Sequence, residues 1–330
     1  MKIHWLIPGN HSSMEALSKS QVASTRMRAA LVEKYSSNFQ IEFTAGDRIS
    51  TKVDMIVVGK IGRDCQNGRD NLWLSQISEA KKNSTKIVLD YTDNHLELKK
   101  SPMNDFYINI LPHISQSIVP SEHMSLQLEK FFNKRITIIE DPVEFETIAP
   151  KLQNQQKNLT LLWFGHASNI SYLSKYLQNE SLCDIDFSIN ILSNMPGIEL
   201  IASQKKNFRS GIKLNLSEWT FKNMIHYAKQ SDACLIPSDL HDIRKSGVSS
   251  NRLITAFALG LPVSADKLLS YAPFSEYFQD IRSAPLSIFI KQMDIYLTKC
   301  TDAQLNIVPK FSHDVIAQKW KFFFKNTILN

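Results

Sequence analysis

The stretch Ser231–Ser264 reads SDACLIPSDLHDIRKSGVSSNRLITAFALGLPVS. Its apolar run Ala233–Ile236 predicts a strand that is buried on both faces. A polar loop, Pro237–Ser249, follows this strand, and Ser250–Leu259 then has the pattern of a helix. Gly260 comes just after that helix, where a left-handed backbone is common. The stretch therefore predicts one strand–loop–helix unit of a parallel sheet.

The same alternation of strand and helix extends through both halves of the chain. The predicted strands are Ile3–Ile7, Asp54–Val58, Lys86–Leu89, Ser117–Val119 and Ile136–Ile139, then Leu159–Phe164, Phe187–Leu192, Gly211–Leu214, Ala233–Ile236 and Pro262–Ser264. The predicted helices are Thr25–Tyr35, Leu72–Lys82, Ser121–Phe132, Ile170–Leu177, Ser217–Gln230 and Ser250–Leu259. Strands that alternate with helix-length segments indicate βαβ units, so we expect an α/β protein with two Rossmann-like, doubly wound domains.

The chain has 330 residues, which suits two domains better than one. The segment Ile148–Asn158 is rich in Gln and Asn and is a candidate linker. We therefore expect domains at 1–150 and 151–311, facing each other across a cleft in which the ligand binds. The last segment, 312–330, is expected to form a helix that crosses back to the first domain.

Composition narrows the class of protein further. No apolar run approaches the roughly 20 residues that a membrane span needs, and the N-terminus lacks the features of a signal peptide. The four cysteines are scattered, without the spacing of a zinc site or a disulfide framework. These features predict a cytoplasmic protein with at most a peripheral contact at the inner face of the membrane.

Charge is divided unevenly along the chain. Residues 1–150 hold 18 Lys or Arg and 18 Asp or Glu, whereas residues 151–330 hold 20 and 14, which accounts for the net charge of +6. A basic second half suits an anionic ligand such as a diphosphate. It also suits an anionic membrane, a nucleic acid or an ordinary solvated surface, and charge alone does not separate these alternatives.

The start of the helix after Pro237–Ser249 is a candidate anion site. A helix N-terminus presents unpaired N–H groups and a positive dipole end to an anion. Lys245 and Arg252 flank this terminus, and short polar side chains surround it. These are Ser238, Ser249, Ser250 and Asn251, with Ser249 or Ser250 as the N-cap. Such a group can hold a diphosphate without a glycine-rich loop, although a capped helix with two solvated cations is the simpler alternative.

The residues from Lys245 to Val263 resemble the signature of a known family. Lys245 and Ser250-Asn251-Arg252, followed by Ala256, Gly260 and Pro262-Val263, resemble the donor-site signature of group-1 glycosyltransferases, which have the GT-B fold. In that signature K-S-x-N-R precedes A-x-x-x-G-x-P-V, and here two extra residues separate Lys245-Ser246 from Ser250. The resemblance implies a retaining enzyme that transfers a sugar from a nucleotide-sugar donor.

The resemblance continues through the rest of the chain. Leu161–Gly165 resembles the first strand of the donor domain, with Gly165 and His166 at its end, and Trp219 matches a tryptophan often found before the Asp232 strand. Ser24–Arg28 resembles the start of the first helix of the acceptor domain. Other matching segments are Asp90–Asn94 and Val119–Glu122.

Two departures from the family pattern concern glutamates. Many retaining members carry two glutamates eight positions apart, and the second holds the ribose hydroxyls. Gly247 and Thr255 stand at these positions here, so the usual residue for the donor ribose is missing. His166 replaces an arginine that commonly follows the first donor-domain strand, which leaves Lys245 and Arg252 as the cations for the diphosphate.

These observations predict a metal-independent glycosyltransferase that uses a glycan or lipid-linked acceptor, needs no cofactor and does not bind nucleic acid. The chain has no HExxH or DxD motif and no His/Cys cluster at ligand spacing. Lys245 and Arg252 are predicted to stabilise the leaving diphosphate. Asp93 or His95 is predicted to orient the acceptor hydroxyl or act as base. Arg26 is predicted to face the cleft, and Arg28 to be a surface cation.

Two other functions remain open at this stage. A relative that kept the fold but lost the ribose-binding glutamates would be a non-catalytic nucleotide-sugar-binding or scaffolding protein. An epimerase of similar architecture would also bind a nucleotide sugar, but it needs acid and base carboxylates that the sequence does not reveal.

The C-terminal segment Ser312–Leu329 allows two interpretations as well. Trp320, Phe323 and Phe324 recur at helical spacing with Val315 and Ile316, and three lysines surround them. The stripe either packs on the first domain or inserts into a membrane interface.

Overall fold

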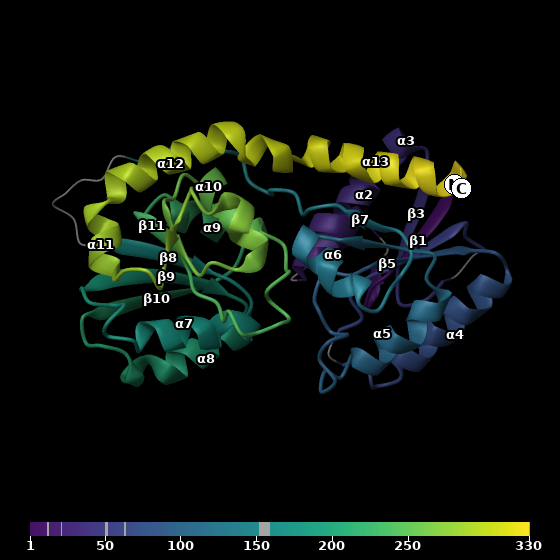
Figure 1. The fold of residues 1–330 in the computed structure, drawn as a ribbon, viewed down its shortest axis with the longest axis horizontal. Coiled ribbons are helices and arrows are strands. Elements are labelled where there is room, and N and C mark those ends of the chain that lie inside the picture. The colour runs from purple at the N-terminus through teal and green to yellow at the C-terminus, as the bar shows by residue number, and fades with distance from the viewer. Residues whose placement is uncertain (12, 21, 50–51, 63, 152–158, 330) are drawn as a thin grey trace. The chain divides into compact units, whose positions relative to one another are not determined.

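The buried strands form two separate sheets, and the chain divides into two units, one around each sheet. The computed structural model describes all residues except 12, 21, 50–51, 63, 152–158 and 330 (Figure 1). The first unit comprises Met1–Pro142, Asp242–Ser249 and Ser312–Asn330, and the second comprises Val143–His241 and Ser250–Phe311. Most of the expected linker, Ile148–Asn158, lies outside the described residues.

The first unit is built on a seven-stranded sheet of order β2-β3-β1-β4-β5-β6-β7. All neighbouring strands pair in parallel except β2 and β3. The strands are β1 Lys2–Leu6, β2 Asn10–His11, β3 Glu42–Gly46, β4 Met55–Val58, β5 Lys86–Asp90, β6 Gln116–Val119 and β7 Ile136–Ile138. The sequence pattern predicted five of them and missed β2 and β3.

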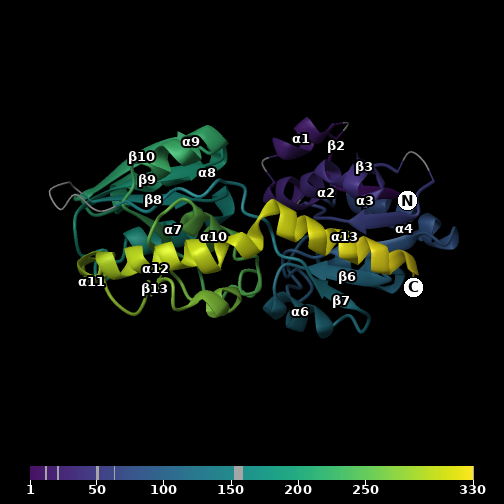
Figure 2. The same ribbon diagram turned by 90° about the horizontal axis from the view of Figure 1, so that it is seen from above.

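Helices cover both faces of this sheet. They are α1 Met14–Ser18, α2 Ala30–Lys34, α3 Ser36–Phe39, α4 Arg69–Lys82, α5 Asn104–Ile110, α6 Glu122–Glu129 and α13 His313–Leu329. A π-helical turn, Thr25–Ala29, leads into α2. One apolar core joins α2 and α13 to one face, and a second joins α4, α5 and α6 to the other. Figures 1 and 2 both show α13 beside α2.

The second unit has a six-stranded parallel sheet of order β10-β9-β8-β11-β12-β13. Its strands are β8 Thr160–Phe164, β9 Phe187–Ser193, β10 Ile212–Glu218, β11 Ala233–Ile236, β12 Val263–Ala265 and β13 Gln279–Asp280. Its helices are α7 Ile170–Leu177, α8 Met195–Gln204, α9 Phe221–Ala228, α10 Asn251–Ala258, α11 Leu286–Lys291 and α12 Met293–Asn306. Gly260 has a φ of 74°, as the sequence predicted for the residue after α10.

The aromatic stripe of α13 is part of the core of the first unit. Trp320 is fully buried, and its ring lies 5.3 Å from that of Trp5 on β1. Phe323 and Phe324 are buried in the same core, whereas Phe322 is 66% exposed. The hypothesis that this stripe inserts into a membrane is therefore wrong for its buried members. Among the described helices, none is both long and apolar enough to span a bilayer.

Arg28, which we expected to be a surface cation, is completely buried in the first unit. Its Nε lies 2.8 Å from Oδ1 of Asp90, at the end of β5. Its Nη1 lies 2.8 Å from both Oδ1 of Asp141 and the carbonyl oxygen of Ile139. The guanidinium also lies over the ring of Trp320, 5.2 Å from its centroid. The prediction failed because the two carboxylates come from distant parts of the sequence.

We expect Trp320→Ala to lower the free energy of unfolding by about 3–5 kcal/mol, since it removes a large side chain from a packed core. Phe322→Ala on the same helix should change it by less than about 0.5 kcal/mol, because that ring is exposed. Urea denaturation measures both values. Equal effects of the two substitutions would contradict the packing of α13 described above.

Arg28→Ala should destabilise the protein by about 3–5 kcal/mol, because it leaves Asp90 and Asp141 as buried carboxylates without their cation. Arg26→Ala, two positions away on a half-buried side chain, should cost less. Unfolding monitored by circular dichroism tests this comparison. A loss for Arg28→Ala no greater than that for Arg26→Ala would show that the buried pairs carry little stability.

Candidate active site

The topology of the second unit indicates where a ligand binds. The chain adds strands in one direction from β8 to β10 and in the other from β11 to β13. The order therefore reverses between β8 and β11, and parallel sheets bind ligands beside the carboxyl ends of the strands at such a point. Gly165 and His166 directly follow β8, and Ser238 follows β11. The structure thus places these three predicted residues after the carboxyl ends of two neighbouring parallel strands.

Arg252 is the second residue of α10, the helix that follows the β11 loop. Its guanidinium lies over the rings of Trp163 and Phe164, 5.4 and 5.7 Å from their centroids. The Nε and Nη2 atoms are buried and have no hydrogen-bond partner among the described residues. Burial lowers the pKa of Arg252, and Tyr271 and Cys234 oppose this shift. A buried cation without a partner can be stabilised by an anionic ligand.

Asp266 is a candidate site residue that the sequence pattern did not reveal. It directly follows β12 and is only 1% exposed. Its carboxylate accepts a hydrogen bond from the backbone N–H of Ser238 at 2.7 Å and forms an ion pair with Arg282. It thereby fixes the start of the β11 loop. The sequence feature that could have revealed Asp266 is an acidic residue directly after a short buried strand.

Other predicted donor-side residues lie at these strand ends with less specific contacts. Gly165 packs closely on Trp163, since an added Cβ would lie 3.2 Å from its ring. His166 is exposed, and its Nδ1 accepts a hydrogen bond from the Ser168 backbone N–H at 3.2 Å. Trp219 follows β10, is half-buried and lies edge-on to Phe221.

The polar residues at the start of α10 differ from the expected cap. Ser250 occupies the N-cap position, but its side chain makes no capping hydrogen bond. Its φ of −76° and ψ of 9° are not the extended backbone that a capping serine adopts. Asn251 is the first residue of α10, and Ser249 is half-buried at the end of the preceding segment.

The first unit has its own reversal of strand order, between β1 and β4. Lys60 follows β4 there, and its Nζ lies 2.5 Å from Oδ2 of Asp93, which follows β5. Burial alone would raise the pKa of Asp93, but the nearby charges of Lys60, Lys245 and His95 lower it well below its usual range. Asp93 is therefore an ionised hydrogen-bond acceptor. The sequence analysis missed Lys60, although its place after a buried strand was a usable signal.

His95 lies in the same cluster as Asp93. Its ring stacks on Tyr107, and its Nδ1 lies 3.1 Å from the hydroxyl of Ser101. Its Nε2 is buried and has no hydrogen-bond partner among the described residues. Burial lowers the pKa of His95 to about 4, opposed by Asp93 and reinforced by Lys60, Arg244 and Lys245. The imidazole is therefore neutral at pH 7 and leaves one nitrogen for a ligand.

Lys245 belongs to this first-unit cluster, whereas Arg252 belongs to the second unit. The segment that contains Lys245, Asp242–Ser249, packs on α6. The Gln127 amide donates a hydrogen bond to the Ile243 carbonyl, and the Ser121 hydroxyl donates one to the Gly247 carbonyl. The Lys245 ammonium is half-buried and has no hydrogen bond or ion pair at contact distance with another described residue. Burial lowers the pKa of Lys245, and Asp93 opposes this shift.

Gly247 shows why the first glutamate of the family pattern is absent. A Cβ on Gly247 would lie 2.6 Å from the Gln127 side chain and 3.0 Å from the backbone nitrogen of Met124. The segment therefore has no room for a larger residue in this arrangement. Thr255, at the second glutamate position, is buried within α10 and only 3% exposed.

Two further candidates have structural partners. Arg26 is half-buried in the π-helical turn, and its Nη1 donates to the carbonyl of Ser20 at 2.8 Å. Asp90, in the Asp90–Asn94 segment that resembles the family, is bound by Arg28. Within the described part of the chain, no three His, Cys, Asp or Glu side chains are grouped as metal ligands.

Comparison with solved structures gives the fold of the whole chain. The structure resembles TarM, with a TM-score of 0.58 and 16% sequence identity over 88% of this chain and 57% of that one. It resembles a glycosyltransferase from Rickettsia africae ESF-5, with a TM-score of 0.58 and 13% identity over 100% of this chain and 99% of that one. The chain has the GT-B fold.

A third structure with this fold is an alpha-glucosyltransferase, AGT, in complex with UDP. Its TM-score is 0.57 at 10% identity, over 98% of this chain and 95% of that one. The chain spans only 57% of the length of TarM. No protein-family model matches the sequence, and comparison with curated proteins gives no match. These similarities establish the GT-B fold. The activity has to be inferred from the residues of the candidate site.

The pKa of His95 predicts a pH dependence of stability. Because its pKa is about 4 in the folded protein and 6.5 ordinarily, the unfolded chain binds more protons between these values. The free energy of unfolding should therefore rise with pH from about 4 to 6.5 and fall as the pH drops through this window. His95→Asn should flatten the slope, measured by urea denaturation at several pH values. His241→Asn, at an exposed position, is the control. If His95→Asn left the dependence of the unfolding free energy on pH unchanged, or if both variants flattened it equally, His95 would not be buried and neutral.

Proposed function

We propose that this protein is a glycosyltransferase that moves a sugar from a nucleotide-sugar donor to a glycan or lipid-linked acceptor. The observation that carries the proposal is Arg252. In a chain with the GT-B fold, it has two buried nitrogens without a hydrogen-bond partner among the described residues, at the start of α10 and beside the reversal of strand order. A diphosphate supplies the negative charge that such a group lacks. The UDP bound to the similar alpha-glucosyltransferase is a ligand of this class.

The chemistry explains why a cation is needed there. Transfer breaks the bond between the anomeric carbon and the diphosphate, and negative charge develops on the leaving oxygen. A positioned guanidinium and the N–H groups of a helix N-terminus stabilise that charge without a metal. Loss of one such contact typically lowers the rate by a factor of about 10²–10³. We propose that the reaction needs neither metal nor cofactor, so that EDTA leaves turnover unchanged.

On the acceptor side, we propose that Asp93 and His95 orient the hydroxyl that attacks. Asp93 is held ionised by Lys60, and the lowered pKa values of Asp93 and His95 make both groups weak bases. They therefore suit hydrogen bonding to the acceptor better than proton removal in the free enzyme. Such a site is consistent with retention, which the family resemblance implies.

A non-catalytic nucleotide-sugar-binding protein is the second candidate. Gly247 is confined by α6 and Thr255 is buried, so neither family glutamate position offers a carboxylate for the ribose. Hydrolysis or transfer of a bound nucleotide sugar distinguishes the two functions. Binding without any turnover across a panel of donors and acceptors would favour the second.

We expect Arg252→Ala to weaken nucleoside-diphosphate binding by about 1.5–3 kcal/mol, the range for a hydrogen bond to a charged group. We predict a similar loss for Lys245→Ala, the second cation assigned to the diphosphate. Calorimetric titration with UDP, GDP, ADP, CDP and TDP gives the affinities and identifies the base.

Arg135→Ala and Lys229→Ala, both at exposed positions, are matched controls for the loss of one positive charge. They should bind the same nucleotide as tightly as the unaltered protein. Unchanged affinity in the Arg252 variant would remove the basis of the donor site. Unchanged affinity in the Lys245 variant alone would confine that site to the second unit.

A further inference from the structure

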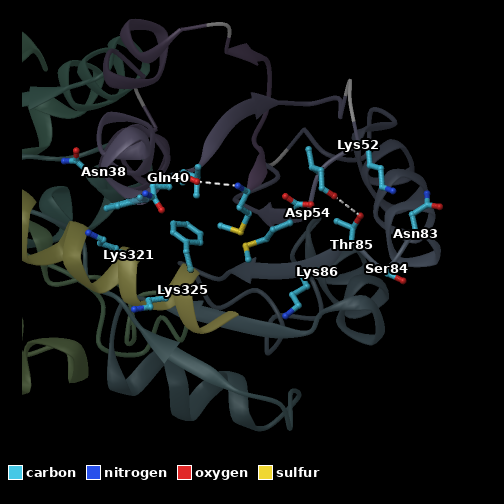
Figure 3. Close-up of a pocket in the computed structure, with 16 residues that line it drawn as sticks. Asn38, Gln40, Lys52, Asp54, Asn83, Ser84, Thr85, Lys86, Lys321 and Lys325 are labelled. Atoms are coloured by element: carbon cyan, nitrogen blue, oxygen red, sulfur yellow. Dashed lines mark hydrogen bonds between the residues drawn. The ribbon is translucent and has the colours of Figure 1, made fainter. Parts of the chain in front are cut away.

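The pocket at the amino ends of β4 and β5 lacks a convergent set of polar groups. It has a volume of about 890 Å³, and Lys52, Lys321 and Lys325 are among the residues that line it. Figure 3 shows Lys52 at the opposite end of the pocket from the two lysines of α13. Polar groups that converge are found at the other end of the same strands, in the loop after β5 that carries Asp93 and His95.

The hydroxyl of Tyr91 binds the backbone of this loop. Tyr91 directly follows β5 and is fully buried, and its backbone N–H donates to the carbonyl of Ile118 on β6 at 2.9 Å. Its phenolic oxygen accepts the backbone N–H groups of His95 at 2.7 Å and of Leu96 at 2.9 Å. Its hydrogen is donated to Oδ1 of Asn94 at 3.2 Å. One hydroxyl group therefore fixes the two peptide groups that flank the His95 side chain.

Asn104 of α5 binds the same two residues through their carbonyl groups. Its buried side-chain amide donates to the carbonyl of His95 at 2.9 Å and to that of Leu96 at 3.0 Å. The backbone N–H and C=O groups of both residues are thus bound by side chains instead of by secondary structure. Because all four groups have a partner, the loop loses conformational freedom. Tyr91 and Asn104 together set the direction in which the His95 side chain leaves the backbone.

The imidazole ring of His95 is held by further contacts. It stacks on Tyr107, with ring centroids 5.6 Å apart and an angle of 3° between the planes. The ring of Tyr91 packs edge-on against the same Tyr107, at 5.3 Å. Nδ1 of the imidazole lies 3.1 Å from the hydroxyl of Ser101. The ring plane and Nδ1 therefore have defined partners, whereas the buried Nε2 has none among the described residues.

The hydrogen bonds of Ser101 indicate which ring nitrogen carries the hydrogen. The Ser101 hydroxyl oxygen accepts the backbone N–H of Met103 at 3.3 Å. Its own hydrogen has no acceptor other than Nδ1 of His95 within the part of the chain that the structure describes. Because a neutral imidazole has one donor and one acceptor nitrogen, an Nδ1 that accepts this hydrogen leaves the ring hydrogen on Nε2. His95 then presents a hydrogen-bond donor to a ligand.

We propose that Tyr91 and Ser101 are positioning residues that make His95 a hydrogen-bond donor to an oxygen of the acceptor. The inference rests on the proposed sugar transfer and gives Asp93 and His95 separate roles. The ionised Asp93 accepts a hydrogen bond from the attacking hydroxyl, and Nε2–H of His95 donates to another oxygen of the same molecule. A glycan presents several oxygens close together, whereas a simple alcohol presents one. The pair of contacts therefore favours a glycan over an isolated alcohol, because a site built for a hydrogen bond discriminates against a molecule that lacks the matching group.

Two-bond ¹H–¹⁵N correlation spectra of the full chain at pH 7 test the tautomer directly, without any ligand. The signals of His95 are identified by their loss in His95→Asn. We expect the Nε2–H form in the unaltered protein and in Ser101→Thr, which keeps the hydroxyl, and a mixture of both forms in Ser101→Ala. Ser78→Ala removes a similar hydroxyl beside His113 and should leave the His95 signals unchanged. An Nδ1–H form in the unaltered protein would overturn the proposal.

Titration with small polyols tests the role in binding. Glucose, galactose and glycerol are the probes, and ethanol, which has one oxygen, is their control. We expect at least one polyol to shift the ring signals of His95 in the unaltered protein and in Ser101→Thr. Ser101→Ala and Tyr91→Phe should bind that polyol up to about tenfold more weakly, the factor for one hydrogen bond. Equal shifts with ethanol, or no shift with any of the three polyols, would contradict the assigned role.

Hydrolysis of UDP-, GDP- and ADP-glucose separates this inference from the proposed function. In Ser101→Ala the rate should stay within about twofold of that of the unaltered protein, because water makes no second oxygen contact. A rate that falls as far as polyol affinity would show that Ser101 supports the whole site and has no specific role toward the acceptor. If the unaltered protein hydrolyses none of the donors, the proposed function fails, whereas the tautomer and the polyol shifts still decide the role of Ser101.

Discussion

The buried Arg28 ion cluster is the constraint on which the first unit depends. Removing a guanidinium from water is costly unless carboxylates or carbonyls compensate its charge, and Asp90, Asp141 and Ile139 do so for Arg28. Trp320 of α13 covers the same group. The requirement fixes the carboxyl end of β5, from which Asp93 and His95 follow within five residues. The stability of the unit and the positions of Asp93 and His95 are therefore set by the same contacts.

Much of the fold could be predicted because parallel sheets leave a simple sequence pattern. The run Ala233–Ile236 is buried on both faces and matches β11 at both ends, and Gly260 marks the end of α10. Strand β3 was missed because it lies near the edge of its sheet, where Glu42 is exposed and the pattern is no longer continuous. Strand β13 has two residues, too few to produce a pattern.

The candidate site was predictable only where sequence order determines position. Arg252 was predicted from its place at the start of a helix, and Gly165 from the resemblance of Leu161–Gly165 to a donor-domain strand. The pairing of Lys60 with Asp93 spans 33 positions, and no local pattern reveals it. Likewise, the packing of Lys245's segment on α6 follows from the close approach of Gly247, a feature of the tertiary structure. Arg28 was misassigned for the same reason, since its burial depends on distant carboxylates.

The position of α13 has a consequence for biosynthesis. The first unit consists of Met1–Pro142, Asp242–Ser249 and Ser312–Asn330, so its core lacks Trp320, Phe323 and Phe324 until α13 has been synthesised. At usual rates of synthesis, roughly 10–40 s pass between the synthesis of residue 142 and that of α13, which covers the apolar face of β1 and α2. During that interval these apolar residues are exposed to solvent, which favours aggregation. A chain that is truncated before α13 therefore lacks part of the core of its first unit.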